Sequence, residues 1–71
     1  MHYFRSPVRQ NFVKLNSELE ISVDVHGDLT FSDAPLEPDW YIMQGYRPIE
    51  RAEFDQVYIK AIEGLNKFAA L

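Results

Sequence analysis

Cysteine is absent from this 71-residue chain, so disulfide bonds and thiolate zinc sites are excluded. Glycine occurs only three times, too sparsely to form a phosphate-binding loop. No apolar run approaches the roughly 18–20 residues of a membrane span, and the first residues lack the continuous apolar core of a signal peptide. We therefore expect a cytoplasmic protein that has no membrane partner.

Lysine and arginine are also absent between Leu15 and Tyr46, in a segment that carries seven carboxylates. These are Glu18, Glu20, Asp24, Asp28, Asp33, Glu37 and Asp39. The residues before this acidic block carry Arg5, Arg9 and Lys14 and no acid. With a net charge of −4 and no basic stripe, the chain is not expected to bind nucleic acid. The block is either a solvated face or a negative surface for a basic partner.

Aromatic side chains are what this short chain has in supply: one Trp, four Tyr and five Phe. A chain of this length buries only roughly 60% of its unfolded surface, so its core is marginal. Each aromatic side chain buries about 150–250 Å², which is enough for a monomer to fold. A dimer is the open alternative, because small domains often gain stability by association.

The clearest element is a helix near the end of the chain. Apolar residues recur there at steps of three and four, which is the spacing of one helix face. They are Phe54, Val57, Tyr58, Ala61, Ile62, Leu65, Phe68 and Ala69. We predict a helix from about Arg51 to Ala69, within a terminal amphipathic unit at residues 50–70.

The start of this helix is also predicted. With Glu50 as N-cap, Ile49 packs on Phe54 as a hydrophobic staple, and Glu53 occupies the position that closes a capping box. Gly64 costs about 1 kcal/mol relative to Ala in a helix interior. It indicates close approach of another backbone or, alternatively, a break in the helix.

A β-hairpin is predicted within the acidic block, because apolar and polar residues alternate on both sides of Gly27. The alternating apolar residues are Leu19, Ile21, Val23, Val25, Leu29 and Phe31. A three-residue loop at residues 26–28 places Val25 opposite Leu29, so both apolar rows share one face. Glu20 and Asp24 then point to the opposite, outer face.

Two further strands are predicted before the hairpin, at Tyr3–Arg5 and Asn11–Leu15, around a turn at Ser6–Gln10. A second turn at Asn16–Glu18 leads into the hairpin. The first 33 residues are thus read as an antiparallel β-meander of three to four strands, with the long C-terminal helix packed on one face. This makes the chain a single α+β domain over residues 1–71.

Residues 34–47 are predicted to form a loop that contains a short helical turn. Residues 40–44 are compatible with either a helix or an edge strand. Pro38 suits a first helical position and Gly45 suits the position after a helix end, so we favour the helix.

Asp24, His26 and Asp28 are the best candidates for metal ligands, because imidazole and carboxylate groups suit zinc or manganese. Their spacing matches no metal motif, and a solvated hairpin tip explains the same residues, so no cofactor is expected. No serine lies in a nucleophile elbow, and no carboxylate pair has the apolar setting that raises a pKa. We therefore expect no enzymatic activity.

The aromatic segment after the loop is the strongest candidate for a contact surface. Its candidate partner-binding residues are Trp40, Tyr41, Met43, Tyr46, Glu37 and Asp39. Trp, Tyr and Met are enriched in interface cores, although core packing is the competing interpretation for about half of this segment. Residues 40–43 cannot all face inward from one helix or strand, so at least one or two of these side chains should be exposed.

The segment Gly45–Tyr58 contains a Gly-Tyr pair, an Ile before the helix cap, a Glu-Phe pair and a Tyr four residues later. In these features the last third of the chain resembles small uncharacterised accessory proteins of phages and mobile elements. Glu50 departs from the Ser or Thr that such proteins usually carry at the cap. The resemblance implies a protein that binds and modulates another protein, and it implies no catalytic residues.

The sequence thus predicts a small protein-interaction module, an accessory modulator or inhibitor, whose partner is another protein or a second copy of itself bound through the aromatic segment. The alternative is a small-ligand or metal-binding domain that uses the hairpin tip.

Overall fold

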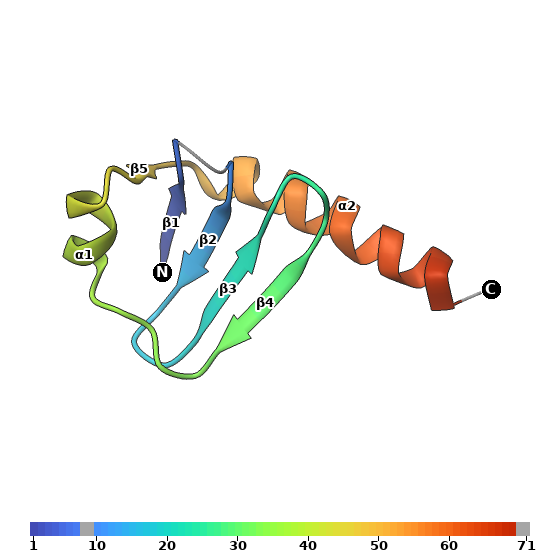
Figure 1. Cartoon of the computed structure of the whole chain (residues 1–71), viewed down its shortest axis with the longest axis horizontal. Coiled ribbons are helices and arrows are strands. Elements are labelled where there is room, and N and C mark those ends of the chain that lie inside the picture. Colours follow the sequence, from blue (N-terminus) through green and yellow to red (C-terminus); the bar gives the residue numbers. More distant parts are fainter. Residues whose placement is uncertain (8–9, 70–71) are drawn as a thin grey trace.

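The computed structural model describes residues 1–7 and 10–69. Its elements are β1 (His2–Arg5), β2 (Phe12–Leu15), β3 (Glu20–Val23), β4 (Leu29–Ser32), α1 (Pro38–Met43), β5 (Arg47–Pro48) and α2 (Arg51–Ala69). Within the described residues, five strands form one antiparallel sheet in the order β4-β3-β2-β1-β5 (Figure 1). The predicted α+β meander with a long terminal helix is confirmed, and β5 is an addition to it.

The first turns of the meander are set by short polar contacts. The Ser6 N–H donates to the Asn11 carbonyl at 2.8 Å, where β1 gives way to the turn. The turn predicted at Ser6–Gln10 includes residues 8–9, which lie outside the described residues. Asn16 Oδ1 accepts the backbone N–H groups of Glu18 and Leu19 at 2.7 and 2.8 Å. This side-chain cap forms the predicted second turn.

The β3–β4 hairpin has a different register from the predicted one. Val23, not Val25, lies opposite Leu29, so the loop consists of residues 24–28. A shift of two residues keeps both apolar rows on one face, because side chains alternate with a period of two. The physical reason is Asp24, whose carboxylate binds amides within the loop and ends β3 early. Val25 therefore lies in the loop and is 48% exposed.

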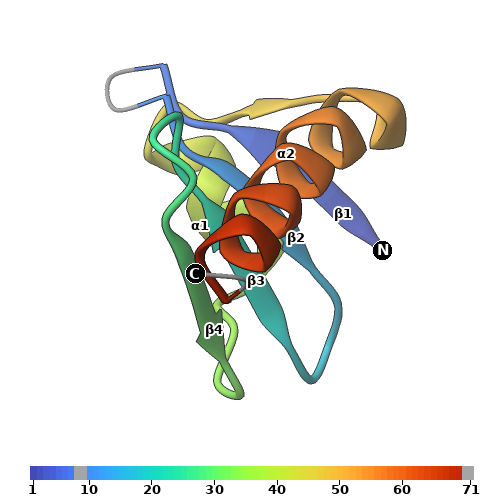
Figure 2. The same cartoon turned by 90° about the vertical axis from the view of Figure 1, so that its right-hand side faces the viewer.

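One face of the sheet packs against α2 (Figure 2). The centre of this core is formed by Val23, Phe54 and Ala61, and the Tyr3 ring lies 5.7 Å from the ring of Phe54. Ile49 packs against the same cluster, immediately before the helix begins. Ile49 and Phe54 thus belong to the same core cluster, as the predicted hydrophobic staple requires. The Glu53 carboxylate, which was predicted to close a capping box, pairs with Arg5 Nη1 at 3.4 Å.

The opposite face, which was predicted to lie outside the core, is also covered. There α1 packs over β1 and β2, and Phe4, Val13, Leu15 and Tyr41 form a second buried cluster. Strands β1 and β2 therefore contribute apolar side chains to both faces of the sheet. Glu20 lies half-buried on this second face, so its assignment to the solvent-facing side was wrong.

Helix α2 runs across the sheet and continues past β4, as Figure 1 shows. It passes through Gly64 without a break, and no heavy atom lies within 4 Å of the Cβ position there. Both interpretations of Gly64 are therefore wrong within a single chain. Every residue of the segment 63–69, called the overhang below, is exposed. Residue 70 of the predicted terminal unit lies outside the described residues.

Candidate interaction surface on α1

Helix α1 is short, and its ends are set by local sequence. Pro38 occupies the first helical turn, where its fixed φ favours the helix and its missing N–H costs nothing. Glu37 precedes it in an extended conformation. Gly45 ends the helix with a φ of +88°, a conformation that residues with a Cβ rarely adopt. The predicted choice of helix over strand for this segment is confirmed.

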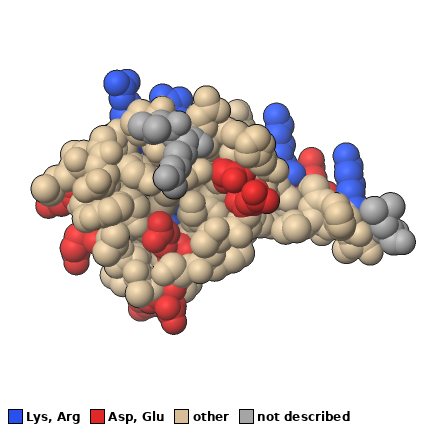
Figure 3. Space-filling model, viewed as in Figure 1, with Lys and Arg blue, Asp and Glu red and all other residues tan. Residues whose placement is uncertain are grey.

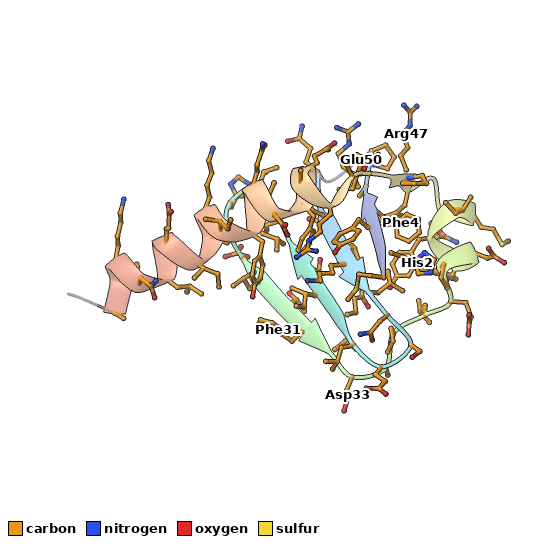
Figure 4. The ribbon with its side chains drawn as sticks, turned by 180° about the vertical axis from the view of Figure 1, so that it is seen from behind. His2, Phe4, Phe31, Asp33, Arg47 and Glu50 are labelled. Carbon is orange, nitrogen blue, oxygen red and sulfur yellow. The ribbon has the colours of Figure 1, made fainter. Side chains whose placement is uncertain are left out.

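Tyr41 fixes α1 to the sheet. Its side chain is 2% exposed and stacks on Phe4 with 5.4 Å between ring centroids. The Tyr41 hydroxyl interacts with the Glu20 carboxylate and with the backbone of Leu36, and both groups act on its pKa. Burial first, and then the Glu20 charge, raises the pKa of the Tyr41 phenol far above its usual range. In Figure 4 the Phe4 side chain lies between β1 and α1.

This position corrects the sequence-based assignment of Tyr41 to partner binding. A buried side chain offers no surface to a partner. Tyr46 is intermediate: it is partly buried, and its ring lies edge-on to Tyr41 at 5.3 Å. Both tyrosines therefore support the helix from below.

The remaining side chains of α1 point outward. At about 100° per residue, Met43 lies opposite Tyr41 on the helix, with Ile42 and Trp40 on its two sides. Met43 is 82% exposed, Ile42 48% and Trp40 41%. We call Trp40, Ile42 and Met43 the α1 surface. Ile42 was not among the predicted contact residues, although the helical period with Tyr41 inward would have identified it.

Acidic side chains surround the α1 surface. Asp39 lies in the first turn of the helix and Glu37 immediately before it, and both are exposed. In Figure 3, red carboxylates gather over α1 and the lower loops, whereas Lys and Arg side chains project along the β5 and α2 edge. The protein thus presents an apolar helix within a negatively charged region.

Trp40 is held more firmly than its exposure suggests. Its ring lies edge-on to Tyr41 at 5.1 Å and tilted against Tyr46 at 6.4 Å. Such aromatic contacts orient a side chain as well as stabilising it. These two ring contacts restrict the orientation of the indole.

The second predicted site, at the β3–β4 loop, serves the local fold. Asp24 Oδ1 accepts the backbone N–H of His26 at 2.8 Å and that of Asp28 at 3.1 Å. The Asp28 N–H is the main cause of the lowered pKa of the Asp24 carboxyl, with a smaller contribution from the His26 N–H. Gly27 has a φ of +87°, and a Cβ built there lies 3.9 Å from the Cα of Ala61. The loop therefore packs against α2 at Gly27.

Among the described residues, the structure adds no further ligand to the candidate metal site at this loop. Among residues 1–7 and 10–69, no three His, Asp or Glu side chains are grouped so that they could hold a metal ion. An open cleft of about 370 Å³ lies between the loop and α2, and its lining includes Asp24, His26, Gln56 and Lys60. This cleft is the part of the site that a small ligand would use.

Comparison with family models, with curated proteins and with solved structures finds no match to this chain. The part of the chain that the structure describes contains no helix with the length and apolar character of a membrane span.

Proposed function

We propose that this protein is a small interaction module that binds another protein through the α1 surface and acts as an accessory modulator or inhibitor of it. One observation carries the proposal: Met43 is 82% exposed on a helix whose opposite side is anchored in the core by Tyr41. Large apolar side chains that a rigid scaffold displays are the usual centre of a protein interface.

The partner expected here has an apolar pocket with Lys or Arg at its rim. Met43, Ile42 and Trp40 fill the pocket, and Trp and Met are enriched at such centres. Glu37 and Asp39 face the basic rim and mainly accelerate association. Binding should therefore weaken with added salt through a slower on-rate.

The test is site-specific photo-crosslinking in the native cell, with the photoreactive residue placed at position 43. A protein captured from position 43 should be lost when Trp40 is also changed to Ala, and its affinity for Met43→Glu should fall about 30-fold or more. The matched control places the same residue at Ile59, which is 54% exposed on α2. Equal capture from both positions, or none from position 43, contradicts the proposal.

A small-ligand site in the loop cleft is the second candidate function, favoured by the cleft of about 370 Å³ beside Asp24 and His26. If the ligand is a metal, millimolar zinc or manganese should raise the melting temperature, and His26→Ala should abolish that shift. An unchanged melting temperature in both metals removes the metal form of this candidate.

A further inference from the structure

Strand β4 is an open edge of the sheet. It lies first in the strand order, and its four residues, Leu29–Ser32, contain neither a charge nor a proline. The other edge strand, β5, has only two residues and includes Pro48. Charges, prolines and short length are the usual protection of edge strands against pairing. Such protection is present at β5 and missing within β4.

The unpaired backbone groups of β4 can be assigned. The Asp24 N–H donates to the Asp28 carbonyl at 3.1 Å, so these two loop residues form a hydrogen-bonded pair immediately next to the Val23–Leu29 pair that begins the ladder. Hydrogen-bonded and non-bonded pairs alternate in antiparallel sheets. The Thr30 groups therefore point toward β3, and those of Leu29 and Phe31 point outward, where a further strand could bind them.

The overhang of α2 carries an apolar stripe that, among the described residues, belongs to neither core cluster. Leu65 is 53% exposed and Phe68 79%, and both continue the helix face that buries Phe54 and Ala61. Because α2 runs across the strands and past the β4 edge, the overhang extends over the space that a strand added to β4 would occupy (Figure 1).

Phe31 is an exposed apolar side chain on the sheet, as Leu65 and Phe68 are on the helix. It shares a cross-strand row with Ile21 and Tyr3, which pack under α2, so it lies on the helix side of the sheet. Leu29, at the other end of β4, packs against the α2 core, but Phe31 is 64% exposed. In Figure 4 it lies at the outer side of the sheet, clear of α2.

We propose that a second copy of this chain pairs its β4 with this β4, antiparallel and about a two-fold axis, to give one continuous sheet. In an antiparallel pair, the Leu29 end of one strand lies beside the Ser32 end of the other. Each overhang, which passes the Leu29 end of its own β4, then covers the partner's Phe31. One arrangement accounts for the open edge, the uncovered stripe and the exposed Phe31.

The dimensions allow this arrangement. A four-residue strand is about 13 Å long, and packed helices lie about 8–10 Å apart. The two α2 helices can therefore lie antiparallel across the strand pair, each over one end. Phe31 and Phe68, at 64% and 79% exposed, offer about 200–350 Å² per copy if each aromatic side chain buries about 150–250 Å². Counted on both copies, these two side chains offer about 400–700 Å². Leu65 and the strand backbone add to this area, which brings the interface toward the roughly 1,200 Å² at which stable complexes begin.

The charges also suit a second copy. Lys60 and Lys67 lie on the projecting half of α2, whereas Asp28 and Asp33 flank β4 in a segment without Lys or Arg. Lys67, which shares the overhang with Glu63, and Lys60 just before the overhang then meet an acidic strand edge twice in the symmetric dimer. This surface lies on the opposite face of the sheet from α1, so the inference does not rest on the proposed function.

The first experiment is sedimentation equilibrium of the full chain from about 1 to 200 μM, with circular dichroism to confirm folding of each variant. The wild type should sediment as a dimer, at twice the chain mass of 8.3 kDa. Phe31→Lys and Phe68→Glu should each raise the dimer dissociation constant about 100-fold or more, since each change affects two equivalent contacts. Met43→Glu, which adds a charge to the α1 surface, is the matched control and should leave the dimer intact.

The second experiment mixes the two disrupted variants. In the mixed dimer the lysine introduced at position 31 faces the glutamate introduced at position 68, and the other contact remains native. The mixture should therefore form a heterodimer that neither variant forms alone. A wild type that stays monomeric up to 200 μM, a dimer that Met43→Glu disrupts, or a mixture that does not associate would each overturn the inference.

Discussion

The hydroxyl group of Tyr41 can be removed without changing the shape of the core. Tyr41→Phe keeps the ring stacked on Phe4 and in contact with Tyr46. It deletes the hydroxyl oxygen that interacts with the Glu20 carboxylate and the Leu36 backbone. The ring packing is kept, so the change reports mainly on the polar contacts that hold α1 against the sheet.

The loss of stability expected for Tyr41→Phe can be estimated from the two groups with which the hydroxyl interacts, the Glu20 carboxylate and the Leu36 backbone. A hydrogen bond to a charged group contributes about 1.5–3 kcal/mol and a neutral one about 0.5–1.5 kcal/mol. Glu20 is only half-buried, so water replaces part of what the carboxylate loses. We expect Tyr41→Phe to lower the free energy of unfolding by about 1–2 kcal/mol. For a domain of this length, the melting temperature then falls by about 4–16 °C.

The effect depends on pH in a defined direction. Burial and the Glu20 charge raise the pKa of Tyr41 in the folded state, so the folded protein holds the phenol proton more tightly than the unfolded chain does. This contribution is complete below the unfolded pKa of about 10 and is lost as the pH rises from there through the folded pKa. The wild type should therefore lose stability above pH 10 by a component that Tyr41→Phe lacks.

Thermal and urea unfolding, followed by circular dichroism at pH 7 and at pH 10–11, measure both effects. The stability gap between the wild type and Tyr41→Phe should narrow at the higher pH. Tyr46→Phe, whose ring lies against Tyr41, is the matched control. A Tyr41→Phe protein that melts within about 1 °C of the wild type at pH 7 would refute the role of the hydroxyl in holding α1.

Three further predictions concern the loop and the long helix. Gly64→Ala should stabilise the protein by about 0.5–1 kcal/mol in urea unfolding at low protein concentration, because no heavy atom lies within 4 Å of its Cβ position. Gly27→Ala should destabilise it by about 1–2 kcal/mol, because the φ of +87° disfavours any residue with a Cβ, even though that Cβ would have room beside Ala61. Asp24→Ala should accelerate hydrogen exchange at the His26 amide. The lowered pKa means that the Asp24 contribution is present above pH 3.8 and lost as the pH falls through the folded pKa.

The sequence predicted an element well where a periodic pattern or a single turn-forming residue determines the local backbone conformation. The spacing of the apolar residues predicted α2, and Asn16 indicated the turn that leads into β3. Pro38 and Gly45 indicated where α1 begins and ends. The hairpin loop was predicted with three residues and has five, because the Asp24 carboxylate binds loop amides and competes with strand pairing.

The candidate site could be predicted only in part. The aromatic segment was correctly expected to be helical and to expose at least one or two of residues 40–43, and three of them are exposed. The choice of which residues are exposed required the position of Phe4 and Glu20, because these distant side chains hold Tyr41 inward. Once Tyr41 is fixed, the helical period places Met43 outward. The roles of the α1 surface and of the β4 edge stay proposals.

The sequence by itself determined the elements and their order, because helix periodicity, strand alternation and turn residues act between near neighbours along the chain. Only the tertiary structure decided that both faces of the sheet are covered, because burial depends on which segments meet in space. It also decided that α2 is longer than the sheet is wide, because the width of the sheet depends on how many strands pair. The overhang and the exposed Phe31 are consequences of that mismatch, and neither can be read from a local pattern.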